Sequence, residues 1–219
     1  MTDRKQGFYE KYVKLPQDIC LAAVGLIVLI PVLLIVAILI RVKLGTPVIF
    51  RQERAGKNGR PYYMYKFRSM SDERDENGEL LPDELRLTKY GKFLRSTSLD
   101  ELPELLNILV GHMSIVGPRP MLDYQAPRCE GDEVLRFKVR PGMTGLAQAK
   151  GRNNISWTER IRYDIEYVNN FSFWLDIKII FGTALMVFKH TGTEVKPEYR
   201  GVDRFSKHYV PEENKTDAE

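Results

Sequence analysis

Residues 95–104 read RSTSLDELPE, and they place two adjacent carboxylates, Asp100 and Glu101, at the expected start of a helix. Proline is tolerated in the first turn of a helix but removes a hydrogen bond further in, so Pro103 predicts that the helix begins near Asp100. Leucines continue from there at helical spacing. The N-terminus of a helix offers free N–H groups and partial positive charge, both of which suit a phosphate group.

The two carboxylates have two interpretations. A carboxylate beside a bound phosphate can ligate Mg²⁺ or attack phosphorus as a nucleophile. Acidic residues are also frequent in first turns because they cap the helix, and Ser98 and Glu101 fit a capping box. Taken alone, this stretch favours helix capping. Other segments of the chain are needed to decide between capping and a catalytic role.

Length and composition narrow the class of protein. A chain of 219 residues suits one compact domain with appendages. Its net charge of +4 comes from no dense basic run, which argues against nucleic-acid binding and fits a surface near anionic lipid or a phosphorylated ligand. Cys20 lies in an apolar run, so we expect no disulfide with Cys129 and place the catalytic part in a reducing cytosol.

Residues 19–40 form an uncharged apolar run, which as a helix is about 33 Å long and can cross the hydrocarbon core of a bilayer. The run is too long for a cleaved signal peptide. Pro31 lies at its middle and predicts a kink. Basic residues flank both ends, and the positive-inside tendency places both flanks in the cytosol. A kinked single span and a re-entrant helix-break-helix are equally consistent with these residues.

Two short segments, residues 48–50 and 62–67, predict a β-hairpin because the turn signal Asn58-Gly59 lies between them. Lys66 leaves the second strand, where it either faces a ligand or lies on a solvated sheet edge.

The connecting and C-terminal segments are less specific. The acidic residues 71–84 predict a solvated loop. Residues 156–168 predict a helix with Ser156 and Glu159 as a capping box. The apolar residues 171–188 predict a core helix or an interfacial helix lying on the bilayer.

Stiff backbone presents several arginines. Arg119 stands between two prolines, Arg140 precedes a Pro-Gly turn, and Arg152 lies just ahead of the predicted helix. A guanidinium on such backbone loses little freedom when it grips a phosphate, although a structural turn explains the Arg119 motif equally well. With Arg95 and Lys66, these cations and the carboxylate pair describe a site for a phosphorylated ligand and Mg²⁺.

The sequence lacks the motifs of the common nucleotide-binding folds and of the serine hydrolases. It contains no GxxxxGK[ST] loop, no GxGxxG motif and no serine with a plausible His/Asp pair. A membrane-embedded element beside a phosphate site indicates that one substrate is a lipid. The residues therefore point to phosphoryl chemistry at a membrane face, and a membrane-anchored, non-catalytic adaptor that binds lipid head groups is the alternative.

Six motifs carry a family resemblance. They are FRQERAG (50–56), YKFRSM (65–70), RSTSLDEL (95–102), VGPRP (116–120), RPGMTG (140–145) and GRN (151–153). In this order they closely resemble the small monotopic phosphoglycosyl transferases of bacteria, over residues 14–188. The resemblance implies an α+β, mostly helical fold with an N-terminal re-entrant membrane helix-break-helix, a small β-hairpin and interfacial amphipathic helices. It divides the chain into a membrane segment (1–44), a catalytic domain (45–190) and a polar tail (191–219).

The resemblance also implies a reaction. Such enzymes move a sugar-1-phosphate from a UDP-sugar to undecaprenyl phosphate at the cytoplasmic face of the bacterial inner membrane, releasing UMP and starting glycoconjugate assembly. It implies that Asp100 is the nucleophile, that Asp100 and Glu101 hold Mg²⁺, and that Arg95, Arg119 and Arg152 bind phosphate or support the site. Membrane phospholipid is a further partner, and a homodimer is compatible with the sequence.

This chain departs from the family pattern at three places. Ile30 precedes Pro31 where a serine is usual, the Lys14 to Asp18 motif lacks its arginine, and His112 stands where an aspartate is usual. None of these positions belongs to the carboxylate pair. The sugar is not encoded in any readable motif, although the small single-domain form of the family leans toward N-acetylated amino sugars.

Overall fold

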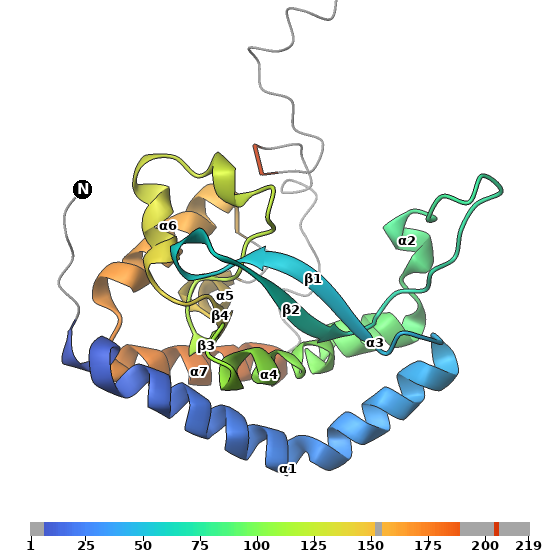
Figure 1. Cartoon of the computed structure of the whole chain (residues 1–219), viewed down its shortest axis with the longest axis horizontal. Coiled ribbons are helices and arrows are strands. Elements are labelled where there is room, and N and C mark those ends of the chain that lie inside the picture. The colour runs from blue at the N-terminus through green and yellow to red at the C-terminus, as the bar shows by residue number, and fades with distance from the viewer. Residues whose placement is uncertain (1–6, 152–154, 189–203, 206–219) are drawn as a thin grey trace, which may run out of the picture.

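The computed structural model describes residues 7–151, 155–188 and 204–205, and these are mostly helical around two small sheets (Figure 1). The helical elements up to the middle of the chain are η1 (Tyr9–Val13), α1 (Lys14–Lys43), η2 (Lys57–Gly59), α2 (Asp83–Arg86), α3 (Lys89–Ser96), η3 (Leu99–Glu101) and α4 (Glu104–Leu109). Those that follow are η4 (Ala126–Arg128), η5 (Gly131–Lys138), α5 (Leu146–Gly151), α6 (Trp157–Asn170) and α7 (Phe173–Phe188). The strands are β1 (Ile49–Ala55), β2 (Pro61–Phe67), β3 (Ser114–Val116) and β4 (Gly142–Thr144).

Helix α1 runs below the rest of the molecule and bends near its middle (Figure 1). It is one helix of 30 residues that continues through Pro31, so the expected division into two helices is not seen. A proline inside a helix removes one backbone hydrogen bond, which makes it a usual position for a bend. The helix is long and apolar enough to cross a membrane by length and composition.

Helix α1 buries residues against the rest of the protein in both of its halves. Ala22, in the first half, packs with Leu105 of α4, and Val36 and Ile40, in the second half, pack with Phe67 and Leu94. Both halves therefore contact the same globular body.

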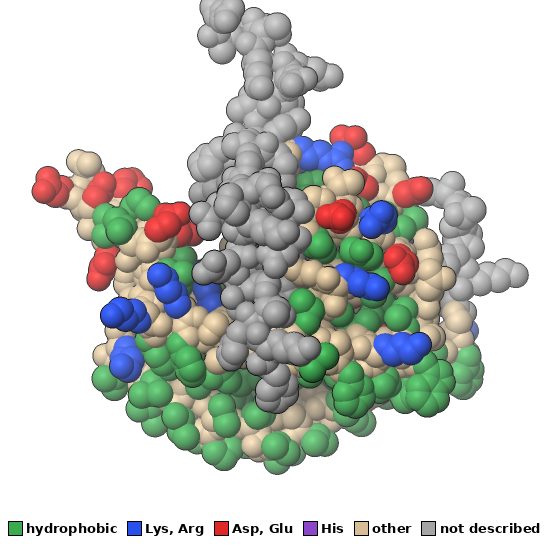
Figure 2. Space-filling model, turned by 180° about the vertical axis from the view of Figure 1, so that it is seen from behind, with side chains coloured by type: hydrophobic (Ala, Val, Ile, Leu, Met, Phe, Trp, Pro, Cys, Tyr) green, Lys and Arg blue, Asp and Glu red, His purple; other side chains and the backbone are tan. Residues whose placement is uncertain are grey.

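The opposite face of α1 and its neighbours expose large apolar side chains, which we call the apolar base. Figure 2 shows hydrophobic side chains gathered along this edge of the molecule. The base comprises Leu21, Val24, Ile27, Val28, Ile30, Leu34, Ile35 and Ile38 of α1, Leu106 and Leu109 of α4, and Trp174, Phe181 and Leu185 of α7.

The predicted hairpin is confirmed. Strands β1 and β2 pair antiparallel from Ile49↔Phe67 to Ala55↔Pro61, and Asn58 adopts a φ of 58° in the connecting turn. Asn107 of α4, which is fully buried, donates to Tyr63 O (2.7 Å) and accepts from Tyr65 N (2.9 Å). These two bonds hold α4, and with it the preceding turn, against β2.

A second, parallel sheet joins β3 to β4, with Ser114 opposite Gly142. A Cβ on Gly142 would lie 2.1 Å from the backbone nitrogen of Gly117, so this approach of the two strands requires a glycine. Val116 and Leu146 pack there with Tyr167 of α6 and Ile179 of α7 in one core cluster.

Two further sequence expectations concern α6 and α7. The Ser156–Glu159 capping box is confirmed, with Glu159 N donating to Ser156 Oγ and Ser156 N donating to Glu159 Oε2. Helix α7 contributes to the core through the buried Asp176 and Ile179, and its exposed apolar residues belong to the apolar base.

Candidate active site

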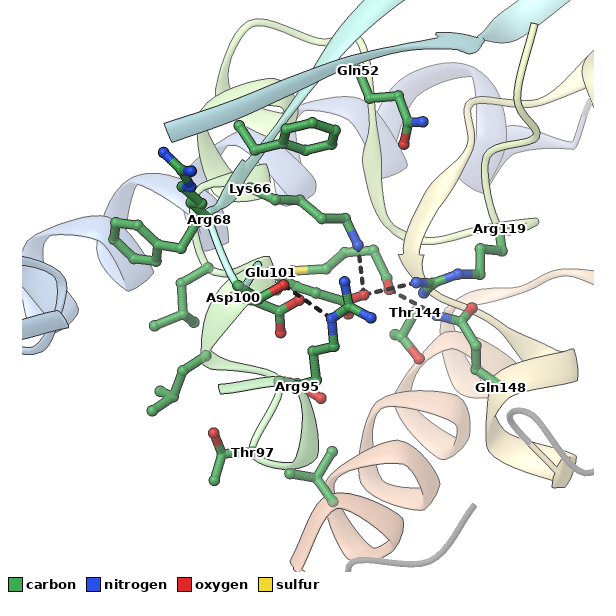
Figure 3. A pocket seen from close by; sticks show the side chains of 18 of the residues that line it. Gln52, Lys66, Arg68, Arg95, Thr97, Asp100, Glu101, Arg119, Thr144 and Gln148 are labelled. Carbon is green, nitrogen blue, oxygen red and sulfur yellow. Dashed lines mark hydrogen bonds and ion pairs between the residues drawn. The ribbon is translucent and has the colours of Figure 1, made fainter. Parts of the chain in front are cut away.

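A cavity of about 1060 Å³ lies between the hairpin, η3, β4, α5 and α7. Figure 3 shows Lys66, Arg95, Arg119 and the Asp100–Glu101 pair converging on it. The charged residues that line it are Arg54, Lys66, Arg68, Asp72, Asp83, Arg86, Arg95, Asp100, Glu101, Arg119 and Arg160. The excess of cations suits a ligand with more than one negative charge.

The carboxylate pair lies on the short 3₁₀ turn η3, before the α-helix rather than on it. Ser98 adopts the left-handed conformation (φ 57°), which turns the chain between α3 and η3, and α4 begins at Glu104 with Pro103 as its N-cap residue. The expected helix start near Asp100 is therefore wrong by one turn. The Ser98–Glu101 capping box is wrong too, because the Glu101 carboxylate is held by cations from distant segments.

Glu101 is the electrostatic centre of the site. Its Oε1 accepts a 2.7 Å hydrogen bond from Lys66 Nζ and another of 2.7 Å from Arg119 Nη2. Burial alone would raise the pKa of Glu101, but the charges of Arg119 and Lys66 hold that pKa well below its usual range. Glu101 is thus ionised throughout the physiological range, and it fixes two cations at the cavity wall.

Asp100 has a different environment. Only 8% of the residue is exposed, and its carboxylate makes no hydrogen bond or ion pair with the described residues. Burial, followed by the charge of Glu101, raises the pKa of Asp100 to about 6 against the opposing charges of Lys66, Arg95 and Arg119. The pair therefore combines an anchored carboxylate with one whose oxygens remain available to a ligand.

Glu104 is a third carboxylate that sequence reasoning did not select. It is 2% exposed, and its Oε1 lies 3.0 Å from Lys66 Nζ. Burial, then the charge of Glu101, raises the pKa of Glu104 to about 7. Its signal in the sequence is its place one turn after Asp100, but Pro103 before it and Leu105 after it suggest only a helix start.

Arg54 was not predicted from the sequence as a site residue, although it belongs to the FRQERAG motif. Its Nη2 donates to Gln52 Oε1 (2.7 Å) and its Nη1 to Pro120 O (3.3 Å). Burial, then the neighbouring charge of Arg119, lowers the pKa of Arg54 to about 10. Two adjacent guanidinium groups at one cavity wall are stabilised when an anion lies between them.

The other predicted cations divide into two groups. Arg95 lines the cavity, and its Nε donates to Ser69 Oγ (2.9 Å). Arg140 is not brought to the cavity, because its guanidinium pairs with Asp18 of α1 (2.8 Å) and donates to Met113 O (3.0 Å). Arg152 lies outside the described residues.

His112 also lies away from the cavity lining. It is exposed, and its ring centroid is 5.7 Å from that of Tyr62.

The donor set can be tested against Mg²⁺. No cluster of three or more His, Cys, Asp or Glu that could hold a metal occurs among the described residues. Magnesium is commonly held by one or two carboxylates together with phosphate oxygens of a substrate, and it prefers oxygen ligands. Asp100, with Glu101 beside it, fits that second kind of site, in which the ligand completes the coordination.

The chain matches a known protein family. The family described as bacterial sugar transferase matches residues 9–190. The chain is 48% identical over 163 residues to an uncharacterized sugar transferase, EpsL, of Bacillus subtilis, and the alignment covers 74% of this chain and 81% of that protein.

Two further relatives carry more specific names. One is the UDP-glucose:undecaprenyl-phosphate glucose-1-phosphate transferase of Klebsiella pneumoniae, 44% identical over 183 residues, which are 79% of this chain and 39% of that protein. The other is the exopolysaccharide production protein PSS of Rhizobium leguminosarum, 43% identical over 182 residues, 77% of this chain and 91% of that protein. The chain thus spans most of two of these relatives and about two fifths of the third.

Proposed function

The chain belongs to the bacterial sugar transferase family and is an enzyme of the phosphoglycosyl transferase class, and from this premise we propose its reaction. It transfers a sugar-1-phosphate from a UDP-sugar to undecaprenyl phosphate, releases UMP and initiates glycoconjugate assembly. The Klebsiella relative's name specifies UDP-glucose and undecaprenyl phosphate, which supports this pair of substrates.

The observation that carries the proposal is the contrast between the two adjacent carboxylates. Glu101 is committed to Lys66 and Arg119, whereas Asp100 lines the cavity without a hydrogen-bonded partner among the described residues. A nucleophile must be free to approach the reacting atom and must be surrounded by charge that offsets the anion it attacks. Asp100 meets both conditions.

The first step is proposed as attack by Asp100. A carboxylate oxygen of Asp100 forms a bond to the sugar-bearing phosphorus, and the bond from that phosphorus to the bridging oxygen breaks. The electron pair leaves with UMP, and an aspartyl-phosphosugar remains on the enzyme. An oxygen of the lipid phosphate then attacks the same phosphorus, which restores the Asp100 carboxylate and yields a sugar diphospholipid.

The cations have a role in both steps. Charge on the transferred phosphoryl oxygens must be neutralised throughout, and positioned cations do this without reorganising. Lys66 and Arg119 are already oriented by Glu101, and Arg95 and Arg54 line the same cavity. Asp100 and Glu101 are the residues proposed to hold Mg²⁺, which when bound would supply further charge neutralisation to the phosphates.

The membrane arrangement is proposed from α1. Its two halves pack on one body, and its outer face belongs to the apolar base. We assign a re-entrant path in which α1 enters and leaves by the cytosolic leaflet of the inner membrane. The basic residues on both flanks support this orientation, and the lipid acceptor would then share the leaflet with the cavity.

A UMP-release screen tests the proposal. Purified full-length protein with undecaprenyl phosphate and Mg²⁺ is given a panel of UDP-sugars, beginning with UDP-glucose, UDP-galactose and N-acetylated UDP-amino sugars. We expect UMP and a lipid-linked sugar diphosphate from at least one donor, and neither from Asp100→Asn. A non-catalytic lipid-binding adaptor would release no UMP from any donor with or without Mg²⁺.

A further inference from the structure

The cavity has one wall that the phosphate chemistry does not use. Opposite the cationic hairpin, the strands β3 and β4 and the helices α5 and α7 supply mainly apolar side chains. We call this the apolar wall, and it comprises Ile115, Met143, Ala147, Ile180, Thr183 and Val187. In Figure 3, Thr144 and Gln148 mark this side of the carboxylates, away from the strand that carries Lys66.

Helix α7 connects the apolar wall to the apolar base. Ile180, Thr183 and Val187 follow one another at spacings of three and four residues and line the cavity. Phe181 and Leu185 lie on the outward face and are 71% and 55% exposed. Only the thickness of this helix therefore separates the cavity that Asp100 lines from the apolar base.

The two threonine hydroxyls on this side of the cavity are satisfied within the protein, whereas Gln148 Oε1 is buried without a hydrogen-bond partner among the described residues. The hydroxyls of Thr144 and Thr183 lie 2.5 Å apart and bond to each other, which holds α7 against β4. Gln148 Nε2 donates to Met143 O (3.0 Å). A hydrocarbon chain needs only apolar contact. The lining offers that contact through Ile115, Met143, Ala147, Ile180 and Val187.

We propose that the apolar wall binds the first isoprene units of the acceptor lipid, so that its chain leaves the cavity past α7 toward the membrane. This inference rests on the proposed function, since it assumes a polyprenyl phosphate acceptor. One cavity then offers cations to the phosphate and the faces of Ile180 and Val187 to the adjoining chain. The charge distribution matches an amphiphile whose polar end lies at Asp100.

The test compares two matched double variants. Ile180→Thr/Val187→Thr changes the apolar wall, and Val28→Thr/Leu185→Thr makes similar changes on the apolar base. Initial rates are measured in detergent micelles while polyprenyl phosphate and UDP-sugar are varied separately. We expect the wall variant to raise KM for the lipid by about tenfold, since two aliphatic contacts are weakened, with KM for the UDP-sugar unchanged and the base variant like wild type.

Three outcomes would overturn the inference. An unchanged KM for the lipid removes the wall from acceptor binding. An equal rise in both double variants assigns the effect to general membrane contact, and a raised KM for UDP-sugar alone assigns the wall to the donor. If the wall variant unfolds, the isosteric single variant Val187→Thr is measured instead. Its KM for the lipid should rise by about threefold.

Failure of the proposed function looks different from failure of this inference. Wild-type protein that makes no lipid-linked product from any UDP-sugar would refute the reaction, and with it the acceptor site. Wild-type activity combined with an unchanged wall variant would refute only the assignment of the wall.

Discussion

Lys66 donates a 2.7 Å hydrogen bond to Glu101, which ties the second strand of the hairpin to the turn that carries Asp100. Lys66 also lies 3.0 Å from Glu104, so one ammonium group balances two carboxylates. The position of the proposed nucleophile therefore depends on an ion pair between segments that are distant in sequence.

The first prediction concerns removal of that ammonium group. Lys66→Met leaves Glu101 with only Arg119 and Glu104 without a cation, and breaking a buried pair in this way typically costs about 3 kcal/mol. We expect a loss of stability of that size in chemical denaturation and a fall in kcat/KM of about 100-fold. Lys57→Met, on the exposed hairpin turn, is the control and should change neither. A fully active Lys66→Met enzyme would contradict the arrangement.

The second prediction concerns the proposed nucleophile. After incubation with the correct UDP-sugar and no lipid acceptor, intact-mass analysis should show one added sugar phosphate on wild type and none on Asp100→Asn. Absence of the adduct from wild type, with product formed only when donor and lipid are present together, would exclude the covalent step. Full turnover by Asp100→Asn would exclude Asp100 as the nucleophile.

The same substitution has a stability consequence. The pKa of Asp100 is raised to about 6 in the folded protein, so ionisation is disfavoured there and wild type loses stability as pH rises from about 4 through 6. The amide side chain of the Asp100→Asn variant cannot ionise. Above pH 7 the variant should therefore be more stable than wild type by about 1–3 kcal/mol, and the difference should shrink toward pH 4.

The third prediction uses Glu104. Its pKa of about 7 in the folded protein lies above its unfolded value, so its stabilising effect is fully present below about pH 4.5 and is lost as pH rises through 7. Glu104→Gln resembles the protonated acid at every pH. As pH rises from 4.5 to 7, the free energy of unfolding of this variant should increase relative to that of wild type, by at most about 3 kcal/mol. Glu84→Gln, on an exposed helix, should run parallel to wild type.

The fourth prediction distinguishes the roles of two arginines, Arg119 and Arg140, each of which lies next to a proline in the sequence. Arg119→Gln removes a partner of Glu101 inside the cavity, so we expect KM for the UDP-sugar to rise by about tenfold or more. Arg140→Gln leaves Asp18 without its cation, so we expect a stability loss of about 3 kcal/mol with an unchanged KM. Equal effects on KM would contradict the placement of Arg140 away from the cavity.

The fifth prediction concerns the path of α1. In a Cys20→Ser background, Lys5→Cys and Lys57→Cys place one thiol on each side of the apolar helix, while Cys129 is buried. A membrane-impermeant maleimide should label neither thiol in intact cells and both in inverted membrane vesicles. Labelling of residue 5 from outside the cell would establish a full span instead.

Local patterns in the sequence were sufficient where neighbouring residues decide the structure. The Asn58-Gly59 hairpin and the Ser156–Glu159 capping box are confirmed, because each depends on backbone and side chains within a few residues. The Ser98–Glu101 box has the same spacing and does not form. Lys66 and Arg119, which lie 35 and 18 residues away from Glu101, bind its carboxylate instead.

The sequence by itself determined which chemical groups are present: an apolar helix with a central proline, a hairpin, a carboxylate pair and a set of arginines. Only the tertiary structure decided how these groups are used. It paired Arg140 with Asp18, 122 residues away, and brought Arg54 and Glu104 into the site. The physical reason is that a buried charge is stable only beside its partner, and the identity of that partner depends on how distant segments pack rather than on their order along the chain.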